Sequence, residues 1–519
     1  MRHSLSAVAS ALAGALLACA LLAGSPLRQA SGAEGDLNAD ARRIAMPGSP
    51  FGIAWGFIYG AGGVPAEVYM PQLRGMGAGF TKLYIFWSQV EPEKGRFDWS
   101  AIDTFVGQLQ SPDEALVAVW SSSTWATRHA TQMLPPSPAK DPEDYYRFIH
   151  ALVSHCKGRV RYWQNDCEPN SPVYWSGTAE EFVAELKVFH RAVKDADPEA
   201  VVVVGGYDGL FHPPGSTWLI PGQEKGLAFF DHVLKEGADS FDVFDLRLYL
   251  EPEVIPAQVA YMRQKMADLG YRKPIICTEY NGPGFFAFPQ NLAYMNLVTS
   301  WADSVGKGQL SAESEPMKKI EAAIAEMYAK MDTLAPQTQM FMLGCPAELE
   351  QKLRRIECRD LVMRNVYALS AGVQKTLYWD LWHDTSKRDD MMALMYSKHK
   401  LMDYEDGALK KRYPQADAFQ RMAEALRGVE KVTPIEVPER PSLCLFEVQR
   451  RERGPIYVIW DRREAFGGED QPPVAFDLEW RAPGAKAADA LGEAQPVTVT
   501  GGRIRLQVSV TPIFIEPTE

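Results

Sequence analysis

Apolar runs alternate with amphipathic stretches along most of the chain. The runs have the length and the β-branched or aromatic content of buried strands, and they lie at residues 51–56, 80–87, 115–120, 160–164, 200–206, 243–249, 274–278 and 374–380. The stretches between them carry apolar residues at helical spacing, at residues 66–76, 101–109, 141–156, 178–196, 227–236, 256–269 and 361–370. Alternating strands and helices imply a parallel sheet. Eight repeats imply a closed (β/α)₈ barrel, the TIM-barrel form of the α/β class.

Two regions depart from this pattern. Residues at about 286–358 are too many for one barrel loop, and they include a charged helix at 315–334 and the Met340-Phe341-Met342 patch. We interpret this segment as an insertion that acts as a lid or as a subunit contact. From 431 to 519 the runs become short and strand-like, with Gly/Pro-rich turns between them, which is typical of a small β-sandwich. The predicted domains are therefore a barrel over 34–430 and a β-sandwich over 431–519.

The first 33 residues have the pattern of a secretory signal. Arg2 begins it, residues 5–24 are apolar, and Ser31-Gly32-Ala33 offers small residues for cleavage. The sequence therefore predicts an exported protein, periplasmic or secreted. Two alternatives stay open: a lipoprotein signal with Cys19 as the lipidated residue, and an uncleaved anchor helix. No other stretch is long and apolar enough to span a bilayer, so no span is expected in the mature chain.

Composition narrows the partners. The formal net charge is −12, which disfavours nucleic acid and anionic membranes. The oligomeric state stays open. Without the leader six cysteines remain, and Cys345 with Cys358, which bracket part of the insertion, are the favoured disulfide pair. Since the sequence has no CxxC, no HExxH and no His/Cys cluster, it predicts neither a metal nor another cofactor.

Two glutamates end predicted barrel strands. Glu168 follows the fourth strand in Tyr162-Trp163-Gln164-Asn165-Asp166-Cys167-Glu168-Pro169-Asn170, and Glu279 ends the seventh in Pro274-Ile275-Ile276-Cys277-Thr278-Glu279-Tyr280. Barrel active sites lie at the carboxyl ends of the strands, so we expect the two carboxylates to converge there. Paired carboxylates at one site are what cleavage of a glycosidic bond requires. The expected partner is therefore a carbohydrate.

Aromatic side chains also fall at predicted strand ends. The sequence holds 13 Trp and 20 Tyr, and such rings stack on sugar faces as well as filling cores. We expect some of them to line the cleft, with Trp87, Trp125 and Trp382 among the candidates.

Four stretches, taken in order, resemble the motifs of clan A glycoside hydrolases, the retaining (β/α)₈ enzymes, and most closely those of family 39-like bacterial glycosidases. They begin at Leu83-Tyr84-Ile85-Phe86-Trp87, Asn165-Asp166-Cys167-Glu168, Lys273-Pro274-Ile275-Ile276-Cys277-Thr278-Glu279 and Ala371-Gly372-Val373. The resemblance implies Glu168 as general acid/base and Glu279 as nucleophile. It also implies that Tyr249 approaches the nucleophile and that Trp379 floors the sugar subsite.

Two positions depart from the clan pattern. Cys167 stands where the clan has an Asn that bonds the sugar 2-hydroxyl, with Asn165 two positions earlier as a further binding candidate. Lys82 stands where the clan has an Arg, and a point charge orients a carboxylate less rigidly than a planar guanidinium. The resemblance implies hydrolysis of β-linked oligo- or polysaccharide by double displacement. A catalytically weak barrel that binds glycan and a transglycosylase on the same site are the alternatives.

Overall fold

The computed structural model describes residues 49–54, 66–207, 211–213, 223–309, 311, 313–383 and 390–519. The predicted leader at 1–33, with Cys19, lies outside these ranges. None of the described helices combines the length and apolar character that a membrane crossing needs.

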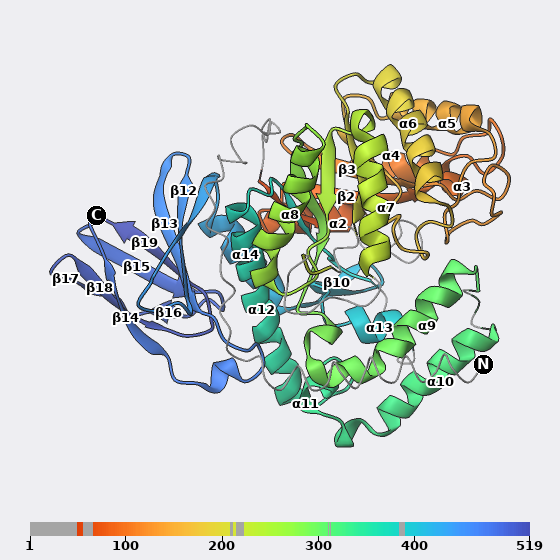
Figure 1. Ribbon diagram of the computed structural model, residues 1–519. Helices are drawn as coiled ribbons and strands as arrows, with labels where there is room; N and C mark the ends of the chain where they lie inside the picture. Colours follow the sequence, from red (N-terminus) through yellow and green to blue (C-terminus); the bar gives the residue numbers. More distant parts are fainter. Residues whose placement is uncertain are drawn as a thin grey trace.

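Eight parallel strands close into a barrel in chain order, with the last strand pairing with the first (Figure 1). They are β1 (Phe51–Ala54), β2 (Phe80–Phe86), β3 (Glu114–Trp120), β4 (Tyr162–Asn165), β5 (Val201–Tyr207), β6 (Val243–Leu246), β7 (Ile275–Tyr280) and β8 (Thr376–Tyr378). Successive side chains of each strand face opposite sides of the sheet, so one set fills the interior and the other packs on the helices. The interior set includes Phe80, Leu116, Tyr162, Val203, Val243, Ile276 and Leu377. The predicted barrel fold is confirmed.

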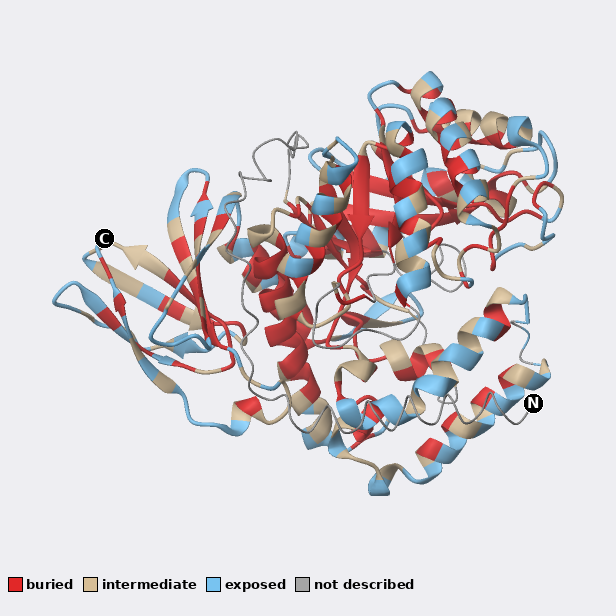
Figure 2. Ribbon diagram, viewed as in Figure 1, coloured by how far each residue is buried: buried red, intermediate tan, exposed pale blue. Residues whose placement is uncertain are grey.

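The barrel helices form the outer layer. They are α2 (Ala66–Gly75), α4 (Ser100–Val106), α5 (Pro142–His155), α6 (Ala179–Ala196), α7 (Gln223–Glu236), α8 (Ile255–Asp268), α12 (Ala347–Ser370) and α14 (Pro414–Ala425). Local sequence determines where these helices begin. Asp141 caps α5, with Pro142 at the first helical position, and Thr178 and Glu181 form a reciprocal capping box on α6. In Figure 2 the strands are buried, whereas the outer helices keep one exposed face.

Smaller elements decorate the barrel. These are the helices α3 (Trp87–Val90) and α13 (Met391–Tyr396), the hairpin β9 (Met402–Glu405) and β10 (Ala408–Arg412), and the 3₁₀ turns η1 (Ala238–Ser240) and η2 (Pro252–Val254).

The segment after β7 carries the extra helices. They are η3 (Phe285–Ala287), η4 (Pro289–Tyr294), α9 (Met295–Gly306), α10 (Glu315–Ala329), η5 (Met331–Thr333) and α11 (Pro336–Gln339). Helices α9 and α10 pack together, and α10 reaches α13 (Figure 1). Val305 and Met317 join the same apolar cluster as Cys167, so the extra helices cover the barrel next to the Glu168 loop. The barrel resumes at the start of α12, residue 347, before the boundary of about 358 expected from sequence.

Helix α12 explains that difference. Nearly all of its residues from Leu353 to Ala368 are buried, because it lies between the barrel, α14 and the C-terminal domain (Figure 2). A helix buried on every side lacks the one-sided apolar stripe by which helices are recognised in sequence.

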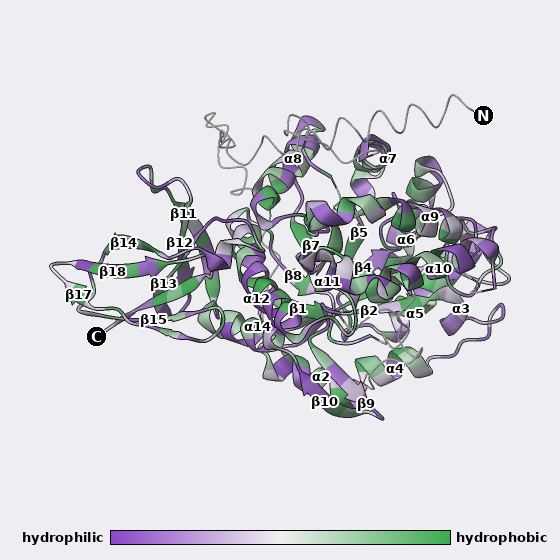
Figure 3. Cartoon of the chain, turned by 90° about the horizontal axis from the view of Figure 1, so that it is seen from below, coloured by the Kyte–Doolittle hydropathy of each residue, from purple (hydrophilic) through white to green (hydrophobic). Residues whose placement is uncertain are grey.

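The C-terminal domain has two antiparallel sheets, seen beside the barrel in Figure 3. The larger runs β11-β12-β13-β19-β15-β16 and the smaller β14-β18-β17. An apolar cluster joins side chains of both sheets, Leu445 and Ile515 from one and Leu478 and Leu506 from the other, as in a β-sandwich. The strands are β11 (Val429–Ile435), β12 (Leu443–Arg450), β13 (Arg453–Asp461), β14 (Val474–Glu479), β15 (Gly484–Asp489), β16 (Ala494–Gln495), β17 (Val499–Thr500), β18 (Arg503–Val508) and β19 (Ile513–Thr518), with the 3₁₀ turn η6 (Gly468–Asp470). The predicted β-sandwich is confirmed.

The predicted disulfide is wrong. All six described cysteines are free, and the Cys345 thiol instead donates to the Met340 carbonyl of its own loop. Cys358 lies eleven residues into α12, which begins at Ala347. That distance along a helix is about 16 Å. A disulfide requires Cα atoms within about 7 Å, so helix α12 keeps the two thiols apart.

Candidate active site

The structure brings the two predicted glutamates together at the mouth of the barrel. Glu279 belongs to β7, and Glu168 lies three residues beyond β4. Carboxylate oxygens of both residues and the Cys167 sulfur lie within 4.8 Å of one another. The two glutamates are 9% and 7% exposed, so each carboxyl group meets a largely desolvated surrounding.

Glu279 is held by donors from strand β2 and from the segment that follows β6. Lys82 and Tyr84 alternate on β2 and therefore share one face; the Lys82 Nζ lies 3.1 Å from Glu279 Oε1, and the Tyr84 hydroxyl donates to the same oxygen. The Tyr249 hydroxyl donates to Oε2 at 3.0 Å. The predicted approach of Lys82 and Tyr249 to this carboxylate is observed.

These contacts determine the charge of Glu279. Burial alone would raise its pKa, but the positive charges of Arg247 and Lys82 and the hydrogen bonds from Tyr84 and Lys82 outweigh burial and lower the pKa to about 2. Glu279 is therefore ionised at neutral pH, as a nucleophilic carboxylate must be.

Arg247, which the sequence analysis missed, bridges the two glutamates. Its guanidinium is fully buried; Nε lies 3.3 Å from Glu168 Oε1 and Nη1 lies 3.1 Å from Glu279 Oε1. The same side chain donates from Nη2 to the Cys167 sulfur at 2.8 Å and from Nη1 to the Thr278 hydroxyl at 2.5 Å. One cation thus orients both carboxylates and Cys167.

A sequence signal for Arg247 exists. Asp245, Arg247 and Tyr249 alternate with apolar residues at the end of the sixth strand, so their side chains share the inward face. A charged pair inside an apolar run implies a buried polar site. Gly206 provides the room, because a Cβ there would lie 2.5 Å from Asp245 Oδ2 and 2.7 Å from Arg247 Nε.

Aromatic side chains surround the pair. Trp379 follows β8, is 5% exposed, and packs edge-on against Tyr396 of α13 with ring centroids 5.1 Å apart. Burial and the charges of Glu168 and Glu279 raise the pKa of Tyr396, and burial and Glu168 raise the pKa of Tyr174. Both tyrosines, absent from the sequence prediction, therefore lie close to the carboxylates, and Trp379 is near the site as expected.

Two predicted binding residues, Trp87 and Asn165, are buried away from the site, and Trp125 and Trp382 are half-buried. Trp87 is fully buried and stacks on Phe148 of α5 at 4.9 Å, and Trp125 packs edge-on against Trp87 at 5.6 Å. Asn165 donates to the Tyr145 hydroxyl of α5 at 3.1 Å. Trp382 packs against the same outer cluster of barrel and helices. The expectation that Trp87 and Asn165 contact substrate is corrected, because both side chains are fully buried against the helical layer. For the half-buried Trp125 and Trp382 the expectation stays a prediction.

Cys167, Glu168 and Glu279 form the one group of three metal-ligand side chains within the described ranges. Lys82 and Arg247 already place two positive charges against these oxygens. These two cations would repel a metal cation at this position, so the arrangement favours a site in which protein side chains supply the positive charge.

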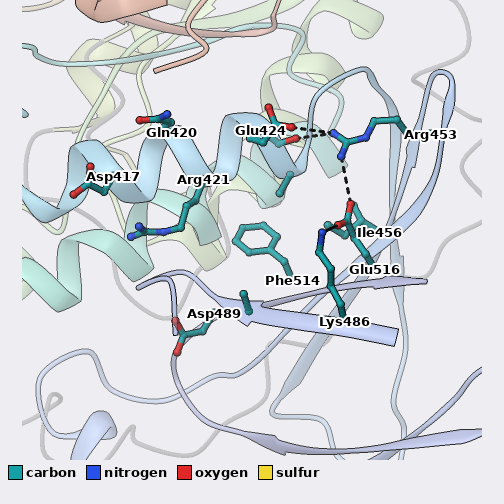
Figure 4. A pocket seen from close by; sticks show the side chains of 12 residues that line it. Asp417, Gln420, Arg421, Glu424, Arg453, Ile456, Lys486, Asp489, Phe514 and Glu516 are labelled. Atoms are coloured by element: carbon teal, nitrogen blue, oxygen red, sulfur yellow. Dashed lines mark hydrogen bonds and ion pairs between the residues drawn. The ribbon is translucent and has the colours of Figure 1, made fainter. Parts of the chain in front are cut away.

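A cavity lies between the barrel and the C-terminal domain. It has a volume of about 530 Å³ and lies between α14 and strands β13, β15 and β19 (Figure 4). Its charged groups pair with one another: Glu516 lies 3.0 Å from Lys486 and 3.7 Å from Arg453, which also pairs with Glu424 at 3.5 Å. None of its lining residues belongs to the Glu168–Glu279 cluster.

Solved structures share this fold. A family 39 glycoside hydrolase from Bacteroides cellulosilyticus WH2 aligns with a TM-score of 0.58 at 14% identity, over 92% of this chain and 82% of that one. The family 30 xylanase C catalytic domain from Talaromyces cellulolyticus aligns at 0.55 and 10%, over 92% and 98%. A family 39 β-xylosidase from Caulobacter crescentus aligns at 0.50 and 13%, over 92% and 98%. No family model and no curated protein matches the chain by sequence. The resemblance to clan A inferred from the motifs is confirmed at the level of the fold.

Proposed function

We propose that this chain is an exported retaining glycoside hydrolase that cleaves a β-linked oligo- or polysaccharide by double displacement. The observation that carries the proposal is the pair of opposed carboxyl groups at the barrel mouth, with oxygens within 4.8 Å. Retaining enzymes hold their carboxyl groups about 5–5.5 Å apart, whereas inverting enzymes leave about 6.5–9.5 Å for a water molecule. Export rests on the leader pattern of residues 1–33.

The roles follow from the unequal surroundings of the two acids. Glu279, ionised and held by Lys82, Tyr84 and Tyr249, attacks the anomeric carbon to form a glycosyl-enzyme. Glu168 gives its proton to the departing oxygen and then takes one from the water that releases the sugar. Arg247 contacts both acids and holds their relative positions through both half-reactions.

Negative charge on Glu279 also helps Glu168 to hold its proton. Like charges at this separation oppose each other, so the ionised nucleophile favours a protonated acid until the glycosyl bond forms. When Glu279 is esterified by the sugar, that opposition ends and Glu168 becomes a base. The same two residues thus serve both half-reactions.

The first test is a mass spectrum of intact protein after incubation with 2-deoxy-2-fluoro glycosides. The panel begins with β-xylosides, because two of the similar structures are a β-xylosidase and a xylanase. A mass increase that maps to Glu279 supports retaining chemistry and identifies the accepted sugar. Adduct formation at another residue contradicts the assignment.

Variants test the roles separately. Glu279→Ala and Glu168→Gln should each reduce hydrolysis by several orders of magnitude while the protein stays folded. Near-normal activity in both would overturn the proposal. Glycan binding by the wild type without turnover would favour a binding barrel, and sugar transfer to an added acceptor would favour a transglycosylase.

A further inference from the structure

A second pair of acids lies directly behind the loop that carries Glu168. Asp166 is the first residue after β4, and Glu185 projects from α6. Asp166 is 0% exposed and Glu185 is 7% exposed. Ser121, the first residue after β3, lies between them. Its hydroxyl is 3.1 Å from Asp166 Oδ2 and also contacts Glu185 Oε1. Two buried carboxyl groups therefore share one hydroxyl.

Hydrogen-bond counting favours an extra proton in this group. A serine hydroxyl has one hydrogen and cannot donate to two carboxylates at once. Both contacts are satisfied only when one carboxyl is protonated and donates to the serine oxygen. Burial and the Glu185 charge raise the pKa of Asp166, and burial raises the pKa of Glu185 to about 7, so that a shared proton is retained near neutrality.

The further hydrogen bonds to the pair come from neutral groups. The Asp166 carboxyl accepts further bonds from the Ser121 amide at 2.9 Å and from the Asn165 side chain at 3.3 Å, and Glu185 Oε2 accepts from the Ala139 amide at 2.9 Å. The Tyr145 hydroxyl of α5 hydrogen-bonds the Ser121 side chain and accepts from Asn165, and burial with the charges of both acids raises the pKa of Tyr145. On α6 the nearest further acid is Glu181, which pairs with Arg128. Among the described residues no lysine, arginine or histidine forms an ion pair with Asp166 or Glu185.

The same residues shape the acid/base loop. Asp166 and Glu168 both have φ of 51°, a left-handed conformation that non-glycine residues adopt only when surrounding contacts hold it. The Asp166 side chain supplies such contacts, since it ties the loop to the end of β3 through both the amide and the hydroxyl of Ser121. The Asp166 amide bonds Val119 of the same strand at 3.0 Å.

We propose that Asp166, Ser121 and Glu185 form a proton-sharing positioning unit that holds the backbone of Glu168 in the geometry needed for proton transfer. The role of Glu168 rests on the proposed function, whereas the holding of the loop does not. When the shared proton leaves, two buried negative charges oppose each other and the loop loosens. None of the three residues touches the substrate in this proposal, so they act through Glu168.

Hydrogen exchange tests the loop without any need for turnover. Amide protection of residues 166–171 is measured by mass spectrometry from mildly acidic to alkaline pH in the wild type, Asp166→Ala, Asp166→Asn and Glu185→Gln. Protection in the wild type should fall above neutral pH relative to other barrel peptides. Glu185→Gln should abolish that fall, because its amide can donate to Ser121 at every pH. Asp166→Ala should lose protection at all pH values.

Leaving-group dependence tests the effect on chemistry. Asp166→Ala should slow glycosides with poor leaving groups by roughly 10- to 100-fold, while activated aryl glycosides, which need little acid assistance, should change far less. Asp166→Asn, which keeps the acceptor for the Ser121 amide, should recover most of the rate. Glu180 is exposed on α6, and Glu180→Gln is the matched control for Glu185→Gln.

The outcomes separate the two proposals. Unchanged loop protection in Asp166→Ala overturns the positioning unit. If the alanine variant does not fold, wild-type loop protection that does not change with pH overturns it. Equal slowing of activated and poor substrates also overturns it, because that pattern reports a loss of folded protein. A wild type without glycosidase activity defeats the proposed function and leaves the exchange result to decide the positioning unit.

Discussion

Two glutamates in different regions of the molecule have similar acidity for similar reasons. At the barrel mouth the pKa of Glu279 falls to about 2 against the effect of burial, through Arg247 and Lys82. At the junction of α12 and the C-terminal domain the pKa of Glu469 also falls to about 2, since hydrogen bonds from Arg355 and Arg359 outweigh burial. Acidity alone therefore does not distinguish a catalytic site from a structural one.

Geometry distinguishes them. Glu469 lies 2.8 Å from Arg355 and 2.7 Å from Arg359, and Lys352 lies 3.5 Å away, so cations from one helix surround it. Glu279 faces a second carboxyl group across the barrel mouth. A perturbed pKa marks charge pairing, and a reactive partner at reaction distance marks function.

The largest contrast is expected from the same substitution at both positions. Glu279→Gln removes the nucleophile and should lower kcat by roughly three orders of magnitude or more with little change in thermal stability. Glu469→Gln should keep kcat/KM within about twofold, because it lies outside the site. Steady-state kinetics and thermal unfolding of both variants check this. A comparable loss of activity in both would remove the distinction.

Arg247→Met should act next most strongly. Without this cation the pKa of Glu279 rises, and because activity needs ionised Glu279, the acidic limb of kcat/KM should move to higher pH by roughly one to three units. Lys82→Met should move it in the same direction by less, since Arg247 has the larger effect on Glu279. The pH profiles of both variants measure this, and an unmoved limb in both would contradict the assigned electrostatics.

Glu469→Gln should reduce stability in a pH-dependent way. The folded pKa of about 2 lies below the usual value of 4.5, so the stabilisation is present above about pH 4.5 and is lost as pH falls toward 2. Its upper limit is about 3 kcal/mol. Urea unfolding of wild type and variant near neutrality and at about pH 3 should show a smaller difference in the free energy of unfolding at the lower pH. A difference independent of pH would contradict the charge pairing.

The smallest effect is expected at Cys167. Its sulfur accepts weakly from Arg247, and the Asn of the clan motif would offer an amide donor instead. Cys167→Asn should change the preference between glycosides with and without a 2-hydroxyl by about tenfold, the value of one hydrogen bond. Cys167→Ser is the size-matched control. Identical preferences in all three proteins would show that residue 167 does not read this position.

Much of the molecule could be predicted from its sequence. The barrel, the β-sandwich and the convergence of Glu168 with Glu279 followed from local periodicity and from the rule that barrel sites lie at strand ends. Trp87 and Asn165 were misplaced because a side chain's face depends on strand register, and a shift of one residue reverses it. Trp87 follows β2 and Asn165 ends β4, as expected, but both side chains point to the helices.

The sequence by itself determined which elements form and which ends carry carboxylates, because hydrophobic periodicity and strand termini are local properties. Only the tertiary structure decided the partners. Arg247 reaches Glu168 and Glu279, which belong to loops and strands distant in the chain, and Glu185 meets Asp166 across Ser121. Closure of the barrel creates these neighbours, and the charge and proton state of a buried acid depend on neighbours that no local pattern encodes.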